Sequence, residues 1–486
     1  MLVENKMLVY NERKEKQAAA KQTFVFQRSL TSKAPAERAR KRESAGLRVT
    51  GTAVNGGFWM ELRDRVRQMK LESMELAAKS GTERNNALGM IRKALLDNEE
   101  AILKANETDM KAAEEAGIAA PVLKRLRFDK KKLNEVTAGI EELIKLPDPL
   151  GRIQLERELD EGLTLVRETC PIGVIGVIFE SRPDAMVQIS SLCLKSGNCA
   201  VLKGGSEALN TNRILFETIH KAAVMAGMPE SCMLQIEARA DINTLLECHE
   251  AIDLLIPRGS NAFVQYIMNN TKIPVMGHAD GICHIYADKD ADIEKAVRII
   301  VDSKTQYAAV CNAVETLLVH KDIAAILMPE LKKAFDEKKV RLLGTKEIRD
   351  IVDCESAAEE DFATEYLDYI ISAKTVNDTD EAIAHINKYG SHHTDCIITE
   401  NRKEAEHFMQ LVDSAGVYQN CSTRFADGFR YGFGAEVGVS TGKLHARGPV
   451  GLDGLVTYKY KLFGDGHIVA DYAEGRKHFH FADKQV

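Results

Sequence analysis

Residues 171–184 read PIGVIGVIFESRPD, and this stretch decides the fold. It joins a continuous apolar run, typical of a parallel strand buried on both faces, to the polar sequence ESRPD. Strands that alternate with helices in the residues beyond it predict a doubly wound α/β sheet. The strand-like segments are 198–205 (NCAVLKGG), 232–236 (CMLQI) and 252–257 (IDLLIP), and helices are expected from about residue 185, over 207–226 and near 241–250.

The ends of these strands carry residues suited to a ligand, because doubly wound sheets bind ligands at the carboxyl ends of their strands. Lys203 ends one strand and Gly204 follows it. The lysine cation can contact a phosphate or ribose, and the glycine lets the ligand come close to the backbone. Gly259 and Ser260 open a predicted helix, whose free N–H groups favour a phosphate. The alternatives are that Lys203 is an ordinary surface lysine and that Gly259 and Ser260 only cap the helix. The motif G-x-G-x-x-G is absent, so an ordinary Rossmann site is not expected.

A second α/β block begins near residue 283 and contains the most reactive candidate. A predicted helix over 290–305 leads into residues 305–318, TQYAAVCNAVETLL, and further strands and helices follow to about residue 415. Cys311 lies in a loop, whereas several other cysteines lie inside apolar strand or helix patterns and read as small core residues. It is either a filler thiol or a nucleophile, and a nucleophilic thiolate needs N–H donors close by.

The composition limits the class of protein. At 486 residues the chain is long enough for two or three domains, with 45% hydrophobic and 28% charged residues, as in ordinary globular proteins. A net charge of −7 argues against a nucleic-acid binder, and no run approaches the roughly 18 apolar residues of a membrane span. The ten cysteines show no CxxC pair and no zinc-like spacing, so we expect reduced thiols, no metal site and a cytoplasmic location.

Four regions are expected along the chain. Residues 1–59 hold twelve Lys/Arg against five Asp/Glu, so they carry +7 and the rest of the chain −14. We expect a disordered extension or translation from an upstream start there, since five acidic residues fit a targeting peptide poorly and the cluster ERARKRE is only a weak nuclear-import pattern. Residues 60–282 should form packing helices and a dinucleotide-binding domain, 283–415 a catalytic domain, and 416–486 a return to the first domain with a tail.

Three local features refine this plan. Thr82 is a candidate N-cap of one packing helix. Residues 150–169 contain two alternating runs around Asp160-Glu161-Gly162, which predicts a long β-hairpin with polar faces that meets another subunit. In the tail, residues 466–472 (GHIVADY) are a further expected strand, and hairpin and tail together suggest an oligomerisation element.

Five segments, taken in order, resemble one known family. They are 171–184, 200–205 (AVLKGG), 310–320 (VCNAVETLLVH), 422–441 (STRFADGFRYGFGAEVGVST) and 445–460 (HARGPVGLDGLVTYKY). The resemblance is to the gamma-glutamyl phosphate reductases, also called glutamate-5-semialdehyde dehydrogenases, of the aldehyde dehydrogenase superfamily. It covers the chain from about Met60 to the tail and implies an aldehyde-dehydrogenase-like α/β fold.

The resemblance also implies a reaction. L-glutamyl 5-phosphate would be reduced with NADPH to L-glutamate 5-semialdehyde, with release of phosphate, as the second step of proline biosynthesis from glutamate. Cys311 matches the family's nucleophile, which forms a thioester that hydride reduces to a thiohemiacetal. The backbone N–H of Cys311 and the side chain of Asn312 are the candidate donors to the oxyanion.

Two positions depart from ordinary aldehyde dehydrogenases. The segment 275–281 (VMGHADG) lacks the glutamate that activates water in those enzymes, which suits a reductase because hydride must arrive before water attacks. His278 is the nearest titratable residue. We expect it to have a structural or substrate-orienting role rather than to act as a catalytic base. Arg182 aligns approximately with the asparagine of their oxyanion hole. It is expected to hold the acyl phosphate, the alternative being an ion pair with Asp184 or Glu180.

Other residues follow from the resemblance alone. Ser206 stands where relatives that use NAD often have a glutamate for the ribose. The resemblance therefore implies that Lys203 meets the 2′-phosphate of NADPH with no carboxylate at that position to repel the phosphate. Glu365 resembles the glutamate that holds the nicotinamide ribose, a solvated loop carboxylate being the alternative. The substrate's amino-acid end is expected to meet Ser422, Thr423 and Arg424, and Cys421 stands where alanine is common.

Alternatives from other classes remain open. An acylating dehydrogenase for another acyl donor would share Cys311 and the cofactor site and differ around Arg182 and 422–424. A catalytically inactive subunit is disfavoured by the intact Cys311 segment. We expect a homo-oligomer (dimer or tetramer), and transient contact with glutamate 5-kinase is plausible because glutamyl phosphate is labile. No kinase-like segment precedes Met60, so a fused kinase–reductase is not expected.

Overall fold

The structure is a computed structural model that describes residues 61–238, 241–277 and 280–485. The predicted extension over 1–59 and His278 lie outside the described residues. The described residues contain two parallel sheets, one antiparallel sheet and a small two-stranded ladder, β14 (Val439–Ser440) and β15 (Gly448–Pro449), near the carboxyl end. None of the described helices combines the length and apolarity that a membrane crossing requires.

The first parallel sheet has four strands in the order β5-β4-β3-β6. The chain enters at β3, moves outward through β4 and β5, and returns to the other side of β3 as β6, so the direction of winding reverses between β3 and β6. Phe179, the last residue of β3, is paired with Arg258, the last residue of β6. Such a switch point is where doubly wound sheets bind ligands. The strands are β3 (Val174–Phe179), β4 (Cys199–Lys203), β5 (Met233–Ile236) and β6 (Leu254–Arg258).

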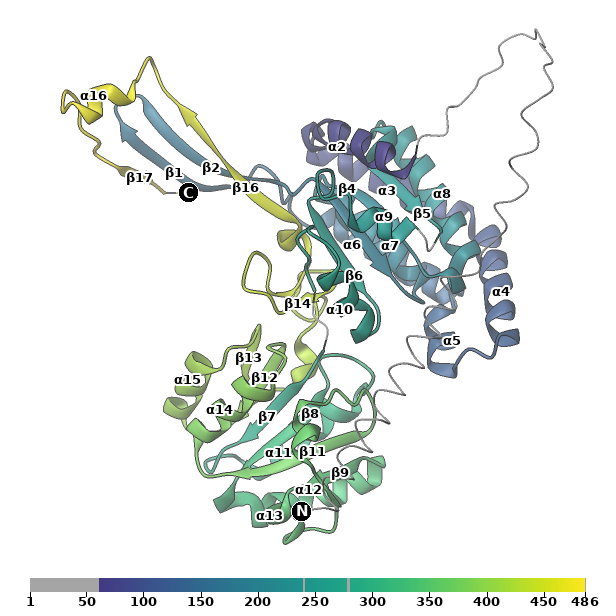
Figure 1. Ribbon diagram of the computed structural model, residues 1–486, viewed down its shortest axis with the longest axis vertical. Helices are drawn as coiled ribbons and strands as arrows, with labels where there is room; N and C mark the ends of the chain where they lie inside the picture. The colour runs from purple at the N-terminus through teal and green to yellow at the C-terminus, as the bar shows by residue number, and fades with distance from the viewer. Residues whose placement is uncertain (1–60, 239–240, 278–279, 486) are drawn as a thin grey trace, which may run out of the picture. The chain divides into compact units, whose positions relative to one another are not determined.

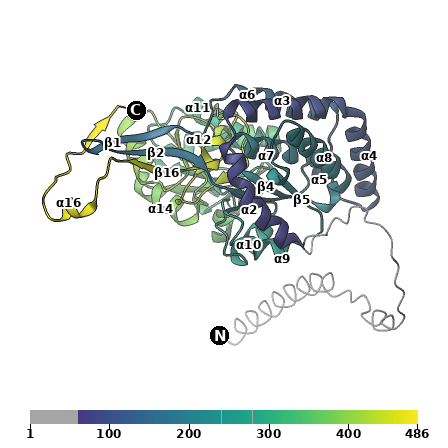
Figure 2. The same cartoon turned by 90° about the horizontal axis from the view of Figure 1, so that it is seen from above.

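Nine helices of the described chain belong to this part. All but α5 contribute to one continuous apolar core with the four strands, and Leu126 of α5 belongs to a small separate cluster. In Figure 2, α3 and α6 run side by side, and the two helices contact one another. The helices are α2 (Leu62–Ala78), α3 (Gly81–Asp97), α4 (Glu99–Glu115), α5 (Ala120–Leu126), α6 (Lys130–Lys145), α7 (Pro183–Lys195), α8 (Leu209–Met225), α9 (Asp241–Leu246) and α10 (Asn261–Asn269).

The cap of α3 corrects the prediction at Thr82. Ser80 is the N-cap: its hydroxyl accepts the Glu83 N–H at 3.2 Å, and the Glu83 carboxylate accepts the Ser80 N–H at 2.8 Å. This reciprocal pair satisfies two donors at once, whereas Thr82 lies one residue inside the helix.

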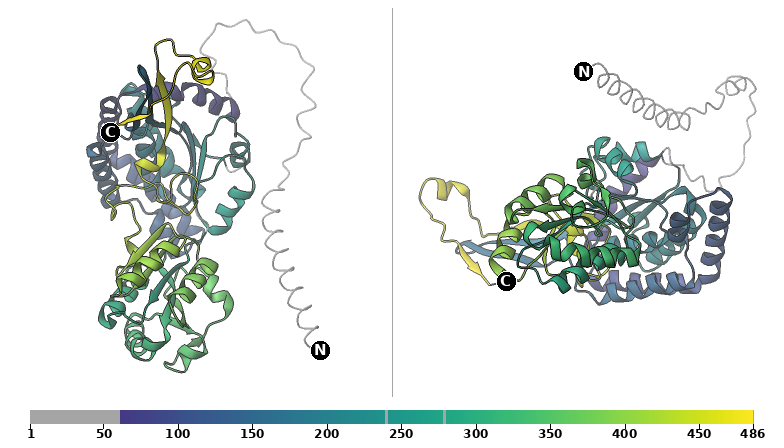
Figure 3. Two further views of the ribbon diagram at one scale, coloured as in Figure 1. Left: turned by 90° about the vertical axis from the view of Figure 1, so that its left-hand side faces the viewer. Right: turned by 90° about the horizontal axis from the view of Figure 1, so that it is seen from below.

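The second parallel sheet has seven strands in the order β10-β9-β11-β8-β7-β12-β13. Alternate residues of its central strands enter different cores: Ile285 and Leu317 pack with α11 and α12, whereas Tyr286 and Leu318 pack with α14 and α15. The two helical layers can be followed in Figures 1 and 3. Its strands are β7 (Cys283–Ala287), β8 (Val314–His320), β9 (Arg341–Gly344), β10 (Glu355–Ser356), β11 (Ile370–Val376), β12 (Thr394–Ile398) and β13 (Gly416–Gln419). Its helices are α11 (Ile293–Thr305), α12 (Lys321–Lys338), α13 (Lys346–Arg349), α14 (Thr379–Tyr389) and α15 (Arg402–Leu411).

The predicted hairpin is confirmed and is part of a four-stranded antiparallel sheet, β16-β2-β1-β17, which Figure 1 shows extending beyond the first parallel sheet. The strands are β1 (Ile153–Asp160), β2 (Leu163–Pro171), β16 (Val456–Phe463) and β17 (Ala482–Lys484). The predicted strand over 466–472 is wrong. That segment contains the short helix α16 (Val469–Ala473), and the tail pairs with β1 only at β17, where Glu158 meets Ala482. The domain boundaries at 282/283 and 415/416 stay predictions.

Candidate active site

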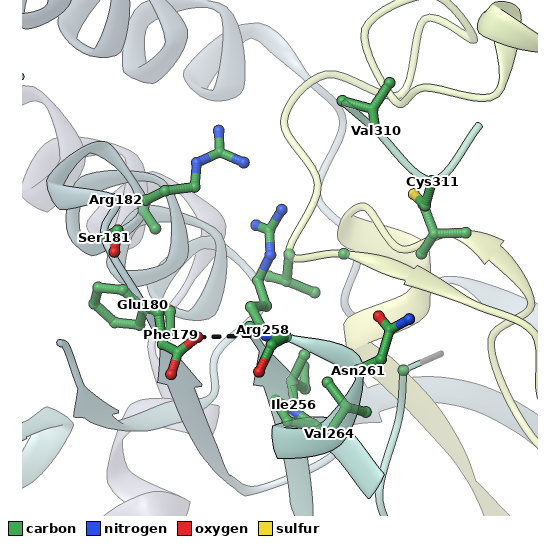
Figure 4. Close-up of a pocket in the computed structure, with 18 of the residues that line it drawn as sticks. Phe179, Glu180, Ser181, Arg182, Ile256, Arg258, Asn261, Val264, Val310 and Cys311 are labelled. Carbon is green, nitrogen blue, oxygen red and sulfur yellow. Dashed lines mark hydrogen bonds between the residues drawn. The ribbon is translucent and has the colours of Figure 1, made fainter. Parts of the chain in front are cut away.

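A cavity of about 700 Å³ lies at the switch point between β3 and β6. Its wall combines the ends of these strands and the start of α10 with the turn that contains Cys311 and with the chain around Glu365. Figure 4 shows this opening. Of the predicted site residues, the cavity brings together Arg182, Gly259, Ser260, Cys311 and Glu365.

The position of Cys311 follows from the second sheet. In the parallel pair β7 and β8, Cys283 is the partner of Val314, so the residues just before both strands are neighbours. Gly281 precedes β7 and Cys311 precedes β8. A Cβ added to Gly281 would lie 2.4 Å from the Cβ of Cys311, so the chain passes the cysteine at a distance that only glycine permits. Cys311 itself is partly exposed, in a turn.

Hydrogen bonds fix this turn from behind. The Asn312 side-chain amide donates to the Ala426 carbonyl at 2.8 Å, and the Thr423 hydroxyl donates to the Asn312 carbonyl at 2.7 Å. Ser303, in α11, lies within 3.1 Å of the Ser422 hydroxyl and accepts the Thr423 N–H. Asn312, Ser422 and Thr423 therefore border the cysteine turn without lining the cavity, and their predicted roles stay predictions.

Arg424 lies in the same layer. It is buried, its Nε donates to Gln306 Oε1 at 3.0 Å, and its carbonyl accepts Arg430. Burial lowers the pKa of Arg424, and the neighbouring Arg430 cation lowers it further. Arg424 does not line the cavity, so its predicted contact with the substrate also stays a prediction.

A fully buried ion pair flanks Cys311. Lys304, in the last turn of α11, donates to the Glu315 carboxylate of β8, and both side chains are 0% exposed. Burial raises the pKa of Glu315 to about 7 and lowers the pKa of Lys304. The second oxygen of Glu315 accepts the backbone N–H of Leu367 at 3.4 Å, and Leu367 lines the cavity two residues after Glu365. The pair thus links both sides of the cysteine turn to the Glu365 segment.

Glu365 also contacts the first sheet's half of the site. Its carboxylate accepts the Asn261 side-chain amide at 3.1 Å, and Asn261 is the first residue of α10. The same amide donates to Asp280, just before β7. Nothing in the sequence pattern distinguished Asn261 from an ordinary helix residue, because its function here depends on a partner about a hundred residues away.

The start of α10 already carries an anion. The Glu180 carboxylate accepts the Ser260 N–H at 3.3 Å, and a Cβ added to Gly259 would lie 2.6 Å from the same oxygen. Close approach of a negatively charged group to these two residues therefore depends on Gly259 having no side chain. A carboxylate at this place fits a helix N-terminus, which attracts anions.

Lys203 and Gly204 lie one strand further out, at the end of β4. Lys203 is buried and donates to the Gly204 carbonyl, and a Cβ at Gly204 would lie 2.2 Å from the Asn212 amide of α8. Neither residue lines the cavity, and their predicted cofactor contacts stay predictions.

Arg182 follows a strained residue. Ser181 has φ +49°, and both its N–H and its hydroxyl donate to the Glu207 carboxylate. Such a left-handed residue costs of order 1 kcal/mol and persists only where neighbours hold it. Arg182 contacts Asp184 at 3.3 Å, with its side chain 43% exposed, so it is only loosely engaged.

Two charged residues of the cavity received no role from the sequence. They are Arg258, the last residue of β6, and Glu436, within the segment 422–441. Desolvation lowers the pKa of Arg258 to about 10, with the neighbouring Arg182 cation as the next cause. Burial raises the pKa of Glu436, whose carboxylate accepts the Gly428 N–H at 2.8 Å.

Comparisons with known proteins agree with this geometry. A profile of the Aldehyde dehydrogenase family matches residues 61–347. The chain is 59% identical over 421 residues to the gamma-glutamyl phosphate reductase of Acetivibrio thermocellus, covering 86% of this chain and 97% of that protein. It is 53% identical over 412 residues to gamma-glutamyl phosphate reductase 1 of Synechocystis sp., covering 85% and 95%. A crystal structure of the gamma-glutamyl phosphate reductase from Thermotoga maritima superposes with a TM-score of 0.82 at 39% identity, covering 84% of this chain and 100% of that one.

The fold and the cysteine site define an oxidoreductase of the aldehyde dehydrogenase class. Within it, the chain belongs to the gamma-glutamyl phosphate reductase family. The predicted fold class and the predicted family are confirmed. The same fold occurs in more distant enzymes, such as an acetylating aldehyde dehydrogenase from Geobacillus thermoglucosidasius, with a TM-score of 0.60 at 17% identity.

Proposed function

We propose that the protein reduces L-glutamyl 5-phosphate to L-glutamate 5-semialdehyde with NADPH and releases phosphate, as the second step of proline biosynthesis from glutamate. The observation that carries this proposal is one cavity in which a partly exposed Cys311 faces two arginines and the start of α10. The names of the relatives support the substrate, since gamma-glutamyl phosphate is what those enzymes are named for.

In the proposed mechanism the Cys311 thiolate attacks the acyl carbon. A C–S bond forms while the C–O bond to the phosphoryl group breaks, which gives a thioester and inorganic phosphate. A nicotinamide cofactor, when bound, would supply the hydride that reduces the thioester carbonyl. The resulting thiohemiacetal collapses to the aldehyde, and the electron pair of the broken C–S bond returns to Cys311. The Cys311 N–H is the first donor to the oxyanion. The Asn312 amide is the second, and it would have to turn from the Ala426 carbonyl toward the cavity, which it does not line in this structure.

The residues present fit a nicotinamide dinucleotide. Glu180 demonstrates that a negatively charged group can reach the Ser260 N–H past Gly259, which is what a cofactor phosphate would need. We assign Gly259, Ser260 and Glu365 to the cofactor, together with Lys203 and Gly204 at the end of β4. An engineered glycolyl-CoA reductase of the same fold was solved with bound NADP+, with a TM-score of 0.59 at 17% identity.

The choice of NADPH over NADH rests on the residues after β4. Ser206 is exposed and has no charge that would repel a 2′-phosphate near Lys203. The adjacent carboxylate, Glu207, is turned toward Ser181 and accepts two hydrogen bonds from it. An NADP-dependent enzyme is therefore the proposal.

For the substrate, we assign Arg182 to the phosphoryl end. Direct contact of Ser422, Thr423 and Arg424 with the amino-acid end would require their bonds to Ser303, Asn312 and Gln306 to rearrange. We further propose a cytoplasmic homo-oligomer that uses the hairpin sheet; the exposed apolar side chains on β16 and the tail, such as Tyr460 and Phe481, support such a contact.

The test is an assay in the reverse direction with glutamate 5-semialdehyde, NADP+ and inorganic phosphate. The proposal expects NADPH formation that depends on phosphate, and its loss in Cys311→Ala. Activity that persists in Cys311→Ala contradicts the nucleophile. Activity that depends on coenzyme A in place of phosphate would instead identify an acylating dehydrogenase.

A further inference from the structure

Arg258 occupies the centre of the candidate site. It is the last residue of β6, next to the end of β3, and it lines the cavity together with Arg182. In Figure 4 the guanidinium groups of Arg182 and Arg258 extend on the same side of the opening, with Val310 and Cys311 across from them. Cys311 also lies within electrostatic reach of Arg258.

The Arg258 guanidinium has no partner within the part of the chain that the structure describes. No described carboxylate forms a salt bridge with it, and no described acceptor forms a hydrogen bond with its side chain, whereas Arg182 at least contacts Asp184. Glu436 attracts Arg258 only at longer range, since no contact joins their side chains. Arg258 is only partly exposed, and an unpaired cation in such a place gains from a ligand that supplies the opposite charge.

Two arginines that face one cavity repel one another. The neighbouring Arg182 cation accordingly lowers the pKa of Arg258, because it disfavours a second positive charge beside it. A ligand with two negative charges removes this repulsion. A planar guanidinium binds two oxygens of a phosphoryl group at once, and a phosphoryl group has enough oxygens for two arginines. A single carboxylate has only two oxygens, so it can bind one arginine in this way. The amino-acid end of a substrate carries an ammonium group, which these cations would repel.

We propose that Arg258 and Arg182 form the binding site for the phosphoryl group of the acyl phosphate, and for the inorganic phosphate that leaves when Cys311 attacks. This inference rests on the proposed function and adds to it the residue that selects an acyl phosphate over an uncharged acyl donor. Arg258 acts on the leaving group: as the C–O bond breaks, the charge that develops on the phosphate oxygens is met by both guanidinium groups.

The test measures alkylation of Cys311 by iodoacetamide without cofactor, with inorganic phosphate as the competing ligand and chloride at matched ionic strength as the reference. We expect phosphate to slow alkylation of the unmodified protein in a saturable way. Arg258→Gln and Arg182→Gln should each raise the half-protecting phosphate concentration about tenfold or more, and Arg258→Lys should fall between. Arg92→Gln removes an arginine outside the cavity, whose partner is Glu141, and should leave protection unchanged.

Three outcomes overturn the inference: protection no greater than that by chloride, protection that survives Arg258→Gln, or an equal loss in Arg92→Gln. Unfolding curves of each variant ensure that a loss of protection reflects the site. In the reverse assay, Arg258→Gln should raise the KM for phosphate and leave the KM for NADP+ unchanged. A raised KM for NADP+ alone would assign Arg258 to the cofactor and leave the proposed function intact. Phosphate protection with no phosphate-dependent NADPH formation would refute the proposed function and leave the phosphate site standing.

Discussion

Two cations, one fully buried and one partly buried, lie on opposite sides of the Cys311 turn, and their surroundings differ. Lys304 lies behind the turn with its carboxylate partner, Glu315, and neither side chain is exposed. Arg258 lies in front of it, in the cavity, and no described residue forms an ion pair with it. A charge that forms an ion pair within the chain fixes the local structure, whereas a charge without such a partner beside a nucleophile can bind a ligand.

The buried pair gives the largest expected effect. In Lys304→Met the Glu315 carboxylate loses its partner in an apolar interior, and the free energy of unfolding should fall by about 3–5 kcal/mol. Urea unfolding at pH 7 measures this. The double variant Lys304→Met/Glu315→Leu removes both charges and should recover most of the loss. A decrease below about 1 kcal/mol in the single variant would show that the pair does not anchor the turn.

A third group, the buried His385, is uncharged in the folded protein at neutral pH. It packs against the rings of Phe362 and Tyr389, and burial lowers its pKa to about 3. Because the folded pKa lies below the unfolded value of about 6.5, the unfolded chain binds the extra proton, and stability falls as the pH drops below about 6.5.

Between pH 7 and pH 5, His385 should cost the fold about 2 kcal/mol, because each pH unit well below 6.5 costs about 1.4 kcal/mol. In His385→Phe, which keeps an aromatic ring among aromatic neighbours, this part of the pH dependence should disappear. Unfolding free energies of both proteins at pH 7 and pH 5 measure the difference. An identical pH dependence in the two proteins would mean that His385 accepts a proton in the folded state.

Glu436 gives the smallest effect and sharpens the comparison at Arg258. Its carboxylate attracts Arg258 and, less strongly, Arg182, so it competes with a bound phosphate. In Glu436→Gln the half-protecting phosphate concentration should fall about threefold, as for loss of a weak, partly screened charge interaction. A rise in this concentration would show instead that Glu436 orients the arginines.

The sequence was sufficient where one segment determines its own structure. The apolar run over 174–179 has no other stable place than a buried strand, and the hairpin around Gly162 follows from local turn chemistry. Local patterns also misled: the apolar residues near Val469 lack a strand partner and form a short helix instead. The segment of the tail that pairs with β1 is β17, near the end of the chain, and the alternation of polar and apolar residues did not identify it.

The site was harder to predict because it depends on which strands become neighbours. Arg258 became significant only once β6 was seen beside β3, and Gly281 only once β7 was seen beside β8. Ser422 and Thr423 were predicted near the cysteine and lie near it, yet they contact its turn from behind. Sequence spacing gives the proximity of such residues, but the direction of a side chain follows from packing.

The central claim is that Cys311 carries the acyl group between phosphate and hydride transfer. The most direct measurement is the intact mass of the protein after it is mixed with glutamate 5-semialdehyde and NADP+ without phosphate and quenched rapidly in acid. We expect a glutamyl adduct that peptide mapping locates on Cys311, and we expect it to disappear when phosphate is added before the quench. NADPH formation with no adduct on Cys311, or an adduct on another residue, would contradict it.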